Sequence, residues 1–143
     1  MIKKVKSYME NRIRDKIKEI EKYLYELSEI KPNNIEEYLD DFKTKAACER
    51  YFEKIMESVV DLAFLVIKNK SFATPEDDKK AFEILENEGI ITNELSEKLK
   101  DAKGMRNIIA HEYGNVDDNI MFESITEQIE NDVKEFIDNI KKL

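Results

Sequence analysis

Apolar residues recur at helical spacing along most of the chain. Between residues 2 and 30 they follow one another at steps of three or four, with Lys and Glu between them. Such spacing gathers the apolar side chains on one face of a helix. Pro32 ends the pattern, because the residue before a proline is pushed out of helical geometry. The pattern predicts one long amphipathic helix over Ile2–Ile30.

The next stretch predicts a single helical turn and then a long buried helix. Asn34 is a turn or cap residue before residues 35–39, and Asp40 or Asp41 is expected to cap the following element. Over residues 42–68 the apolar stripe is too wide for a helix with neighbours on one side only. We expect a central helix buried on two faces, the second of which is a candidate contact with another subunit.

The second half of the chain predicts three more helices. Thr74 and Pro75 form a start signal, with Thr as N-cap and Pro at the first helical position. The short helix that follows is expected to end near Gly89. Thr92 is the expected cap of the next helix. The last helix is expected to begin at Asp117 or Asp118 and to bury Ile125, Ile129, Val133, Phe136 and Ile140 in register.

Composition agrees with an all-α fold. The 143 residues include three glycines and two prolines, while 39% are charged and 41% hydrophobic. Few turn-forming residues and many Glu, Lys, Leu and Ile favour long amphipathic helices. Residues 1–143 are predicted to form a single domain, an antiparallel bundle of four long helices plus a short helix.

Charge and apolar runs narrow the functional class. A formal net charge of −8 argues against a protein that coats DNA or RNA nonspecifically, which needs many cationic contacts to phosphate. A small site that touches one or two phosphates is compatible with it. The longest apolar run, residues 62–67, is far shorter than the roughly 20 residues of a membrane span, and no signal-peptide pattern begins the chain. We expect a soluble cytoplasmic protein.

The lone cysteine predicts no special chemistry. Cys48 lies in an apolar helical stretch and has no second cysteine to pair with. It also has no neighbouring ligand set for a metal. Core packing in a reducing compartment is the expected role, and neither metal nor cofactor is predicted.

The residues that carry candidate chemistry lie together near the end of the penultimate long helix. His111 is the only histidine of the chain, and histidine exchanges protons near neutral pH. Arg106 precedes it by five positions and offers a planar cationic fork suited to phosphate. Tyr113 follows, and Gly114 marks a helix end. This combination indicates phosphodiester chemistry. The alternative is structural, since cations near a helix C-terminus also complement the helix dipole.

Geometry limits how this motif can work. Positions five apart on a continuous helix point about 140° away from each other. Arg106 and His111 therefore converge on one substrate only if the helix unwinds near Ala110, or if the site is built from two chains. RNA cleavage by 2′-hydroxyl attack needs a base, an acid and a stabilising cation. One histidine cannot act as base and acid in the same step, whereas a two-fold dimer supplies two.

At this point the sequence resembles a known family. Arg106, His111 and Tyr113 match the arginine-x4-histidine-x-tyrosine signature of the HepT-like branch of the HEPN superfamily, in which Asn107 is the usual polar residue after the arginine. The likeness covers roughly residues 44–137, most of the domain. Besides the motif, it is carried by residues 46–50, 60–63, 81–85, 89–91 and 95–116.

The resemblance implies a homodimeric toxin ribonuclease that needs no metal. Its cleft at the two-fold axis would be lined by Arg106, which holds the scissile phosphate, and His111, the general acid or base, of both chains. The implied partner is a minimal nucleotidyltransferase antitoxin, MntA-like, which transfers AMP to Tyr113. An attached anion would block the cleft and repel RNA. The alternative is a noncatalytic HEPN module that docks such a partner or binds a nucleotide.

Three further residues have open roles. Arg50 matches a basic position of the HepT pattern and is expected either to line the cleft or to pair with Glu49 or a facing acid. Lys100 and Lys103 recur with Arg106 every three residues and are candidates for a basic strip that guides RNA. The alternative for them is again a favourable interaction with the helix dipole.

Overall fold

The structure, a computed structural model, is all-helical over the residues it describes. These are residues 2–111 and 116–143, excluding the side chains of residues 2–7. The elements are α1 (Ile2–Ile30), α2 (Ile35–Asp40), α3 (Phe42–Asn69), α4 (Asp78–Asn87), α5 (Asn93–His111), α6 (Asp118–Glu123), the π-helical turn η2 (Ser124–Gln128) and α7 (Ile129–Lys141). The all-α prediction is confirmed.

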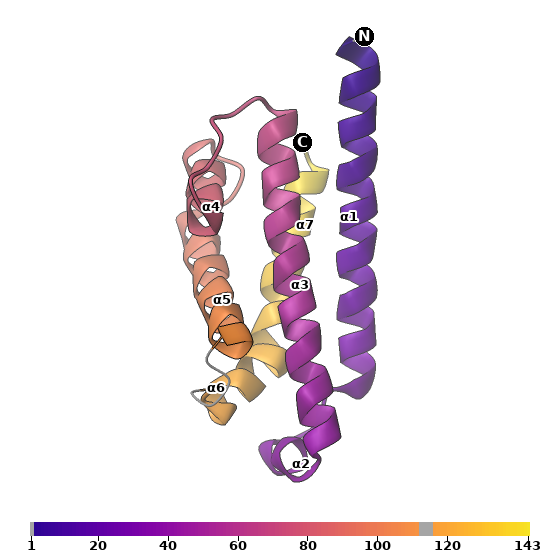
Figure 1. Ribbon diagram of the computed structural model, residues 1–143, viewed down its shortest axis with the longest axis vertical. Coiled ribbons are helices and arrows are strands. Elements are labelled where there is room, and N and C mark those ends of the chain that lie inside the picture. Colours follow the sequence, from indigo (N-terminus) through magenta and orange to yellow (C-terminus); the bar gives the residue numbers. More distant parts are fainter. Residues whose placement is uncertain (1, 112–115) are drawn as a thin grey trace.

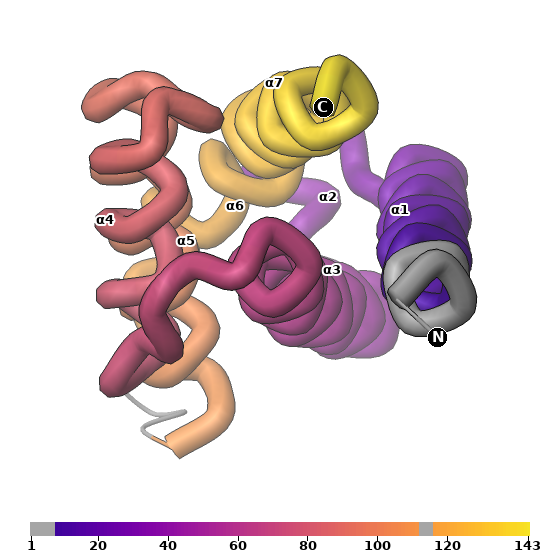
Figure 2. The backbone as a smooth tube through the Cα atoms, turned by 90° about the horizontal axis from the view of Figure 1, so that it is seen from above, coloured from indigo at the N-terminus to yellow at the C-terminus, as the bar shows by residue number. Residues whose placement is uncertain are grey.

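α3 occupies the middle of the molecule. α1 lies along one side of it, α4 and α5 lie along the other, and α7 runs behind it (Figures 1 and 2). Burial follows from this position, since α3 contributes buried side chains from Cys48 to Ile67. The expectation of a central helix that packs on two faces is confirmed. The largest fully buried side chains include Ile20, Tyr38, Phe52, Phe82, Leu99 and Phe136.

Local capping explains most helix starts. The Asn34 side chain accepts a hydrogen bond from the backbone N–H of Glu37, at 2.9 Å, and so caps α2. Asp41 accepts from two backbone N–H groups at the start of α3. Asp117 does the same for α6. Each oxygen satisfies donors that the first helical turn leaves unpaired. Asn34 caps as predicted, and the structure selects Asp41 and Asp117 from the two predicted pairs of adjacent aspartates.

The predicted start of the α4 helix is wrong. Thr74 and Pro75 are not helical; Asp77 is the N-cap, and its side chain accepts from the backbone N–H of Lys80 at 2.8 Å. Pro75 is buried in the connection from α3 instead. The start signal at Thr74 and Pro75 is therefore not used, and the helix begins three residues later at Asp78. The helix ends as expected before Gly89, which has a φ of +75°.

The last helical stretch is interrupted, contrary to the prediction of one continuous helix. Its predicted apolar residues are all buried, but η2 separates α6 from α7. The Thr126 hydroxyl donates to the carbonyl of Phe122 at 2.8 Å, a local bond that tends to bend helices. Lys31 reaches the Thr126 carbonyl at 3.4 Å. Among the described residues, no helix combines the length and apolarity needed to cross a membrane.

Candidate functional site

The candidate motif lies on the last two turns of α5. Thr92 begins this helix as predicted, because its hydroxyl accepts from the backbone N–H of Leu95 at 3.1 Å. The helix is continuous from Asn93 to His111. Tyr113 and Gly114, the remaining residues of the predicted motif, lie outside the described residues.

Arg106 is held by an acid from α3. Its Nη2 donates to Oε1 of Glu57 at 2.6 Å, and its Nη1 donates to Oδ1 of Asn107 at 3.3 Å. The side chain is 21% exposed. Its Nε is buried and has no acceptor among the described residues. The guanidinium therefore keeps an unpaired donor, but an oxyanion would reach it only if the surrounding side chains moved.

Lys103 joins the same network one turn earlier. Its Nζ donates to Oδ1 of Asn107 at 2.6 Å and lies 3.2 Å from Oδ2 of Asp78. The Asn107 oxygen thus accepts from both Lys103 and Arg106, two cations that would otherwise repel each other. The sequence singled out Asn107 as the polar residue that follows the arginine and Lys103 as part of a candidate basic strip, and the structure brings both beside Arg106.

A small cavity of about 160 Å³ opens at this network. It is lined by Glu57, Val60, Asp61, Asp78, Lys103 and Arg106. Three carboxylates against two cations leave its lining with a net negative charge. A phosphate would therefore have to displace at least one carboxylate from Arg106 or Lys103 before binding at full strength.

His111 does not share this cavity. Its side chain is exposed at the end of α5, and the helix does not unwind near Ala110. An ordinary helix puts it about 140° around the axis from Arg106. The first of the two predicted ways of joining these side chains is therefore ruled out, and one copy of α5 does not direct both at one phosphate.

The other predicted cations are paired with acids. Arg50 is exposed and lies 3.7 Å from Glu53, one turn along α3; it does not pair with Glu49, which is buried and contacts Lys45. Arg50 precedes Glu57 by seven residues, about 10 Å along the helix, so it lies outside the Arg106 network.

The predicted basic strip on α5 is neutralised in the same way. Lys100 lies 3.1 Å from Glu83 and 3.3 Å from Glu97. Together with the pairs of Lys103 and Arg106, this leaves each of the three cations with a carboxylate partner. The strip therefore presents little uncompensated positive charge to RNA in the isolated chain.

Sequence reasoning missed Glu57 and Asp78. Both come from other helices, 49 and 25 positions before the cations they bind. The one available signal was a charged residue within the wide apolar stripe of α3, since Glu57 is flanked there by buried Met56 and Ser58. Spacing alone gave no means of connecting it with Arg106.

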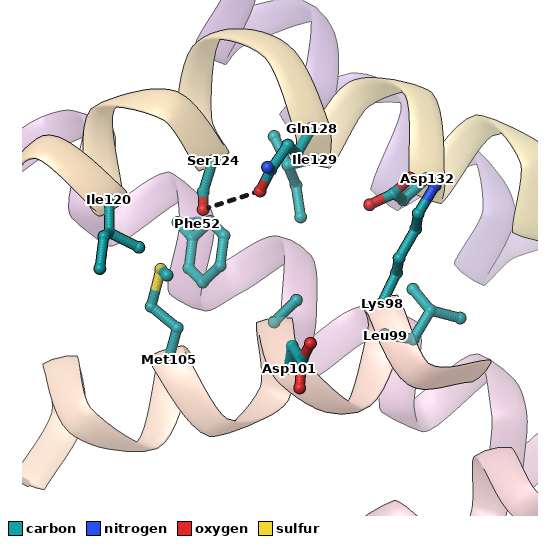
Figure 3. A pocket seen from close by; sticks show the side chains of 11 residues that line it. Phe52, Lys98, Leu99, Asp101, Met105, Ile120, Ser124, Gln128, Ile129 and Asp132 are labelled. Atoms are coloured by element: carbon teal, nitrogen blue, oxygen red, sulfur yellow. Dashed lines mark hydrogen bonds and ion pairs between the residues drawn. The ribbon is translucent and has the colours of Figure 1, made fainter. Parts of the chain in front are cut away.

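A second pocket borders α5 on a different side (Figure 3). It has a volume of about 300 Å³ and lies between α5 and the stretch from α6 to α7. Its walls are mainly apolar, with Phe52 at the back and Met105 on the near side. Its charged groups are Lys98, Asp101 and Asp132, an excess of carboxylate that disfavours a nucleotide. None of the predicted site residues lines it.

Exposed apolar side chains surround the end of α5. Ile108 is 38% exposed and Ile120, from α6, is 52% exposed. Together with Met105 and Val116 they line a shallow hollow. Apolar surface beside a candidate site is typical of a protein contact.

Cys48 lies in the core, away from the candidate site. Cys48 is fully buried, and burial raises the pKa of its thiol to about 11, which makes it a poor nucleophile. Among the described residues, no group of three or more His, Cys, Asp or Glu side chains is arranged to hold a metal ion.

Comparison with protein families and curated sequences gives consistent matches. A family model described as "Ribonuclease HepT-like" matches residues 13–140. The chain is 27% identical over 105 residues to the mRNA nuclease HepT of Shewanella oneidensis. The matched stretch is 73% of this chain and 78% of that protein. It is 25% identical over 114 residues to the tRNA nuclease HepT of Aphanizomenon flos-aquae, covering 80% of this chain and 78% of that protein.

A solved structure has the same fold. The tri-AMPylated HEPN toxin of Shewanella oneidensis, in complex with MNT antitoxin, superposes with a TM-score of 0.84. The superposition covers 92% of this chain and 97% of the toxin chain, at 24% sequence identity. At that identity the likeness establishes a common fold.

Proposed function

We propose that this chain, which belongs to the ribonuclease HepT-like family, is a metal-independent endoribonuclease toxin that works as a homodimer. The observation that carries the proposal is the continuity of α5 through His111. Within one chain the imidazole and the Arg106 guanidinium diverge by about 140°, so a site that uses both must combine two copies. The exposed apolar side chains of Ile108 and Ile120 at the same end of the molecule support a contact there.

Each residue has a chemical role in the proposed site. One His111 removes the proton from a ribose 2′-hydroxyl, which attacks the adjacent phosphorus. The His111 of the second copy protonates the departing 5′-oxygen. Arg106 stabilises the negative charge that develops on the phosphorane oxygens. The reaction leaves a 2′,3′-cyclic phosphate on one fragment and a 5′-hydroxyl on the other.

The supporting network prepares Arg106 for this role. Asn107 and Glu57 orient the guanidinium from two sides, and Lys103 adds a second positive charge beside it. Arg50 lies on the same helix as Glu57 and serves as a peripheral contact for RNA, once it is released from Glu53. Because Glu57 competes with phosphate for Arg106, substrate binding and release of that carboxylate are coupled.

The proposed control of the toxin acts on Tyr113. The partner is a minimal nucleotidyltransferase, MntA-like, that transfers AMP from ATP to the tyrosine hydroxyl and releases pyrophosphate. The phosphodiester formed two residues from His111 would carry negative charge into the cleft and repel RNA. The solved HEPN toxin of Shewanella oneidensis, which is tri-AMPylated and in complex with MNT antitoxin, supports this partner.

Cleavage assays test the proposal directly. Purified wild type, His111→Ala and Arg106→Ala are incubated with RNA in excess EDTA. The wild type is expected to cleave, and each variant to lose about 100-fold or more of the rate, the usual contribution of an acid-base or oxyanion-stabilising group. Equal cleavage rates for wild type and His111→Ala would contradict the catalytic role of His111. Inhibition of the wild type by EDTA would contradict the proposal that cleavage needs no metal.

One observation favours a second candidate function. In the isolated chain Arg106 is already bound to Glu57 at 2.6 Å, as expected if the motif serves structure alone. The protein would then be a noncatalytic HEPN module that docks a nucleotidyltransferase or binds a nucleotide. This alternative requires that the wild type and His111→Ala fail equally to cleave RNA, while both bind the partner.

A further inference from the structure

A groove that shares Asp61 with the small cavity at Arg106 carries cationic and aromatic side chains, as a nucleic-acid subsite does. It lies between α1, the C-terminal half of α3 and the connection to α4, with a volume of about 720 Å³. Figures 1 and 2 show α1 beside α3. The connection to α4 leaves α3 at its C-terminal end. The residues that define the α1–α3 groove for the argument below are Arg12, Lys16, Asp61, Phe64, Lys68 and Phe72.

The groove carries uncompensated positive charge. Lys16 is neutralised by Glu19 at 2.9 Å and Asp61 at 3.6 Å. Lys68 is exposed, and among the described side chains it has no acidic partner. Among the described side chains, Arg12 has one recorded contact: its guanidinium carbon lies 6.0 Å from the centre of the Tyr8 ring. The groove therefore brings together two cations that have no carboxylate partner in the described part of the structure, in a chain of net charge −8, and such a pair attracts a polyanion.

Aromatic side chains flank these cations. Phe64 and Phe72 are both partly exposed and line the groove. Phe72 is fixed by the helix end: its N–H donates to the Ile67 carbonyl at 3.0 Å, and the Ser71 N–H donates to the Lys68 carbonyl at 3.1 Å. This is a Schellman C-cap. Ser71 occupies its left-handed position at φ 58°, where glycine is usual, so the turn that orients Phe72 is retained at some energetic cost.

The groove borders the candidate site at one residue. Asp61 lines both the α1–α3 groove and the small cavity that holds Arg106. Along α3, Lys68 lies eleven residues beyond Glu57, about 16 Å at the rise of an α-helix. A strand with one phosphate at Arg106 can therefore extend along α3 into the groove.

We propose that the α1–α3 groove binds single-stranded RNA beside the scissile phosphate, with phosphates on Arg12 and Lys68 and a base against Phe72. The inference rests on the proposed ribonuclease function and extends it to the substrate. Cations combined with aromatic rings are the usual means of holding single strands without reading their sequence. The groove supplies the positive charge that the neutralised strip on α5 lacks.

RNA binding by the full-length protein tests the groove apart from catalysis. In a His111→Ala background, which prevents cleavage, a fluorescent single-stranded RNA is titrated against Arg12→Ala/Lys68→Ala. We expect about tenfold weaker binding, and a salt dependence of log Kd that is lower by about 1.4, since each phosphate contact on a single strand contributes about 0.7. Phe72→Leu, which keeps apolar volume in the turn, is expected to weaken binding without changing the salt dependence.

A matched control removes the same charge elsewhere. Lys18 and Lys142 are exposed and line none of the cavities described above, so Lys18→Ala/Lys142→Ala should bind RNA like its parent. Equal losses in both double variants would mean that only net charge matters and would overturn the groove. Unchanged RNA binding by Arg12→Ala/Lys68→Ala would also overturn the proposal. The next ligand to test in the groove would then be an acidic protein segment.

The two proposals fail separately. If the wild type cleaves RNA and Arg12→Ala/Lys68→Ala cleaves long RNA with the same KM, the groove is wrong while the ribonuclease stands. If the wild type cleaves nothing but the groove variants still bind RNA more weakly, the ribonuclease is wrong and the groove remains an RNA-binding surface.

Discussion

Nη2 of Arg106 lies 2.6 Å from Oε1 of Glu57, so the phosphate-binding candidate of α5 is held by a carboxylate of α3. A charge-assisted bond of this length fixes the direction of the guanidinium. It also occupies one of the donors that a phosphate would use. Glu57 therefore both orients Arg106 and competes with its proposed ligand.

Glu57→Gln should tighten RNA binding. The amide keeps the volume and an acceptor oxygen, but it removes the negative charge that competes with phosphate. In the His111→Ala background we expect Kd for RNA to fall by about fivefold, roughly 1 kcal/mol. Glu53→Gln, one turn earlier and paired with Arg50, is the matched control and should have a smaller effect. Weaker binding by Glu57→Gln would mean that the carboxylate serves only to orient Arg106.

Mixing wild-type chains with His111→Ala chains should lower the ribonuclease activity if one site needs both histidines. A fixed amount of wild type is refolded with an equal amount of His111→Ala, so that subunits pair at random. Half of the wild-type chains then have an inactive partner, and activity should fall to about half. Lys142→Ala, mixed in the same way, adds active chains, so the total activity should about double. Undiminished activity with His111→Ala would show that each histidine works alone.

A 2′-deoxy substitution should stop cleavage at the substituted position. The proposed nucleophile is the ribose 2′-hydroxyl, so its removal eliminates the reaction there without changing the phosphate. Cleavage sites are first mapped on an all-RNA strand, and the single substitution is then introduced at one of them. The other sites provide the internal control. Continued cleavage at the deoxy position, or fragments without a 2′,3′-cyclic phosphate, would point to attack by water instead.

Asp132→Asn should stabilise the fold in a pH-dependent way. Burial raises the pKa of the Asp132 carboxyl, and Lys98, 3.9 Å away, only partly opposes this. A folded-state pKa above the unfolded one means that the stability associated with this group is lost as the pH rises through the folded value. At pH 7 the amide should therefore raise the free energy of unfolding, by no more than about 1 kcal/mol.

The gain from Asp132→Asn should fade as the pH falls toward about 4, where an ordinary aspartate is itself being protonated. Urea unfolding at both pH values measures it. Asp138→Asn, at an exposed position of the same helix, is the control for a general change in net charge. A gain of equal size at both pH values would contradict the burial of Asp132 as its cause.

Much of the local structure could be predicted from the sequence. Periodicity and the stop at Pro32 together defined α1 to its last residue, because the turns of that helix repeat apolar positions at steps of three or four and a proline follows its end. Asn34 and Thr92 were identifiable as caps, and Asp41 and Asp117 each as one of two adjacent candidates, since a side-chain oxygen satisfies donors within its own first turn. These interactions join residues close in the chain, so their spacing carries the information.

Prediction failed where distant residues compete with local preferences. Pro75 is buried beside the end of α3, and α4 begins three residues later than its start signal. A side-chain bond from Thr126 and a contact from Lys31 accompany the π-helical turn in the last helical stretch. Neither the burial of the proline nor the contact from α1 is encoded in the nearby spacing.

The sequence by itself determined which chemical groups the site contains: one imidazole, a guanidinium five positions before it, and an amide between them. Only the tertiary structure decided their partners and directions. The pairing of Arg106 with Glu57 joins residues 49 positions apart, and the continuity of α5 turns His111 away from that pair. Residue types follow from local order, whereas ion pairs and shared cavities depend on how separate helices pack, which the spacing within one helix does not record.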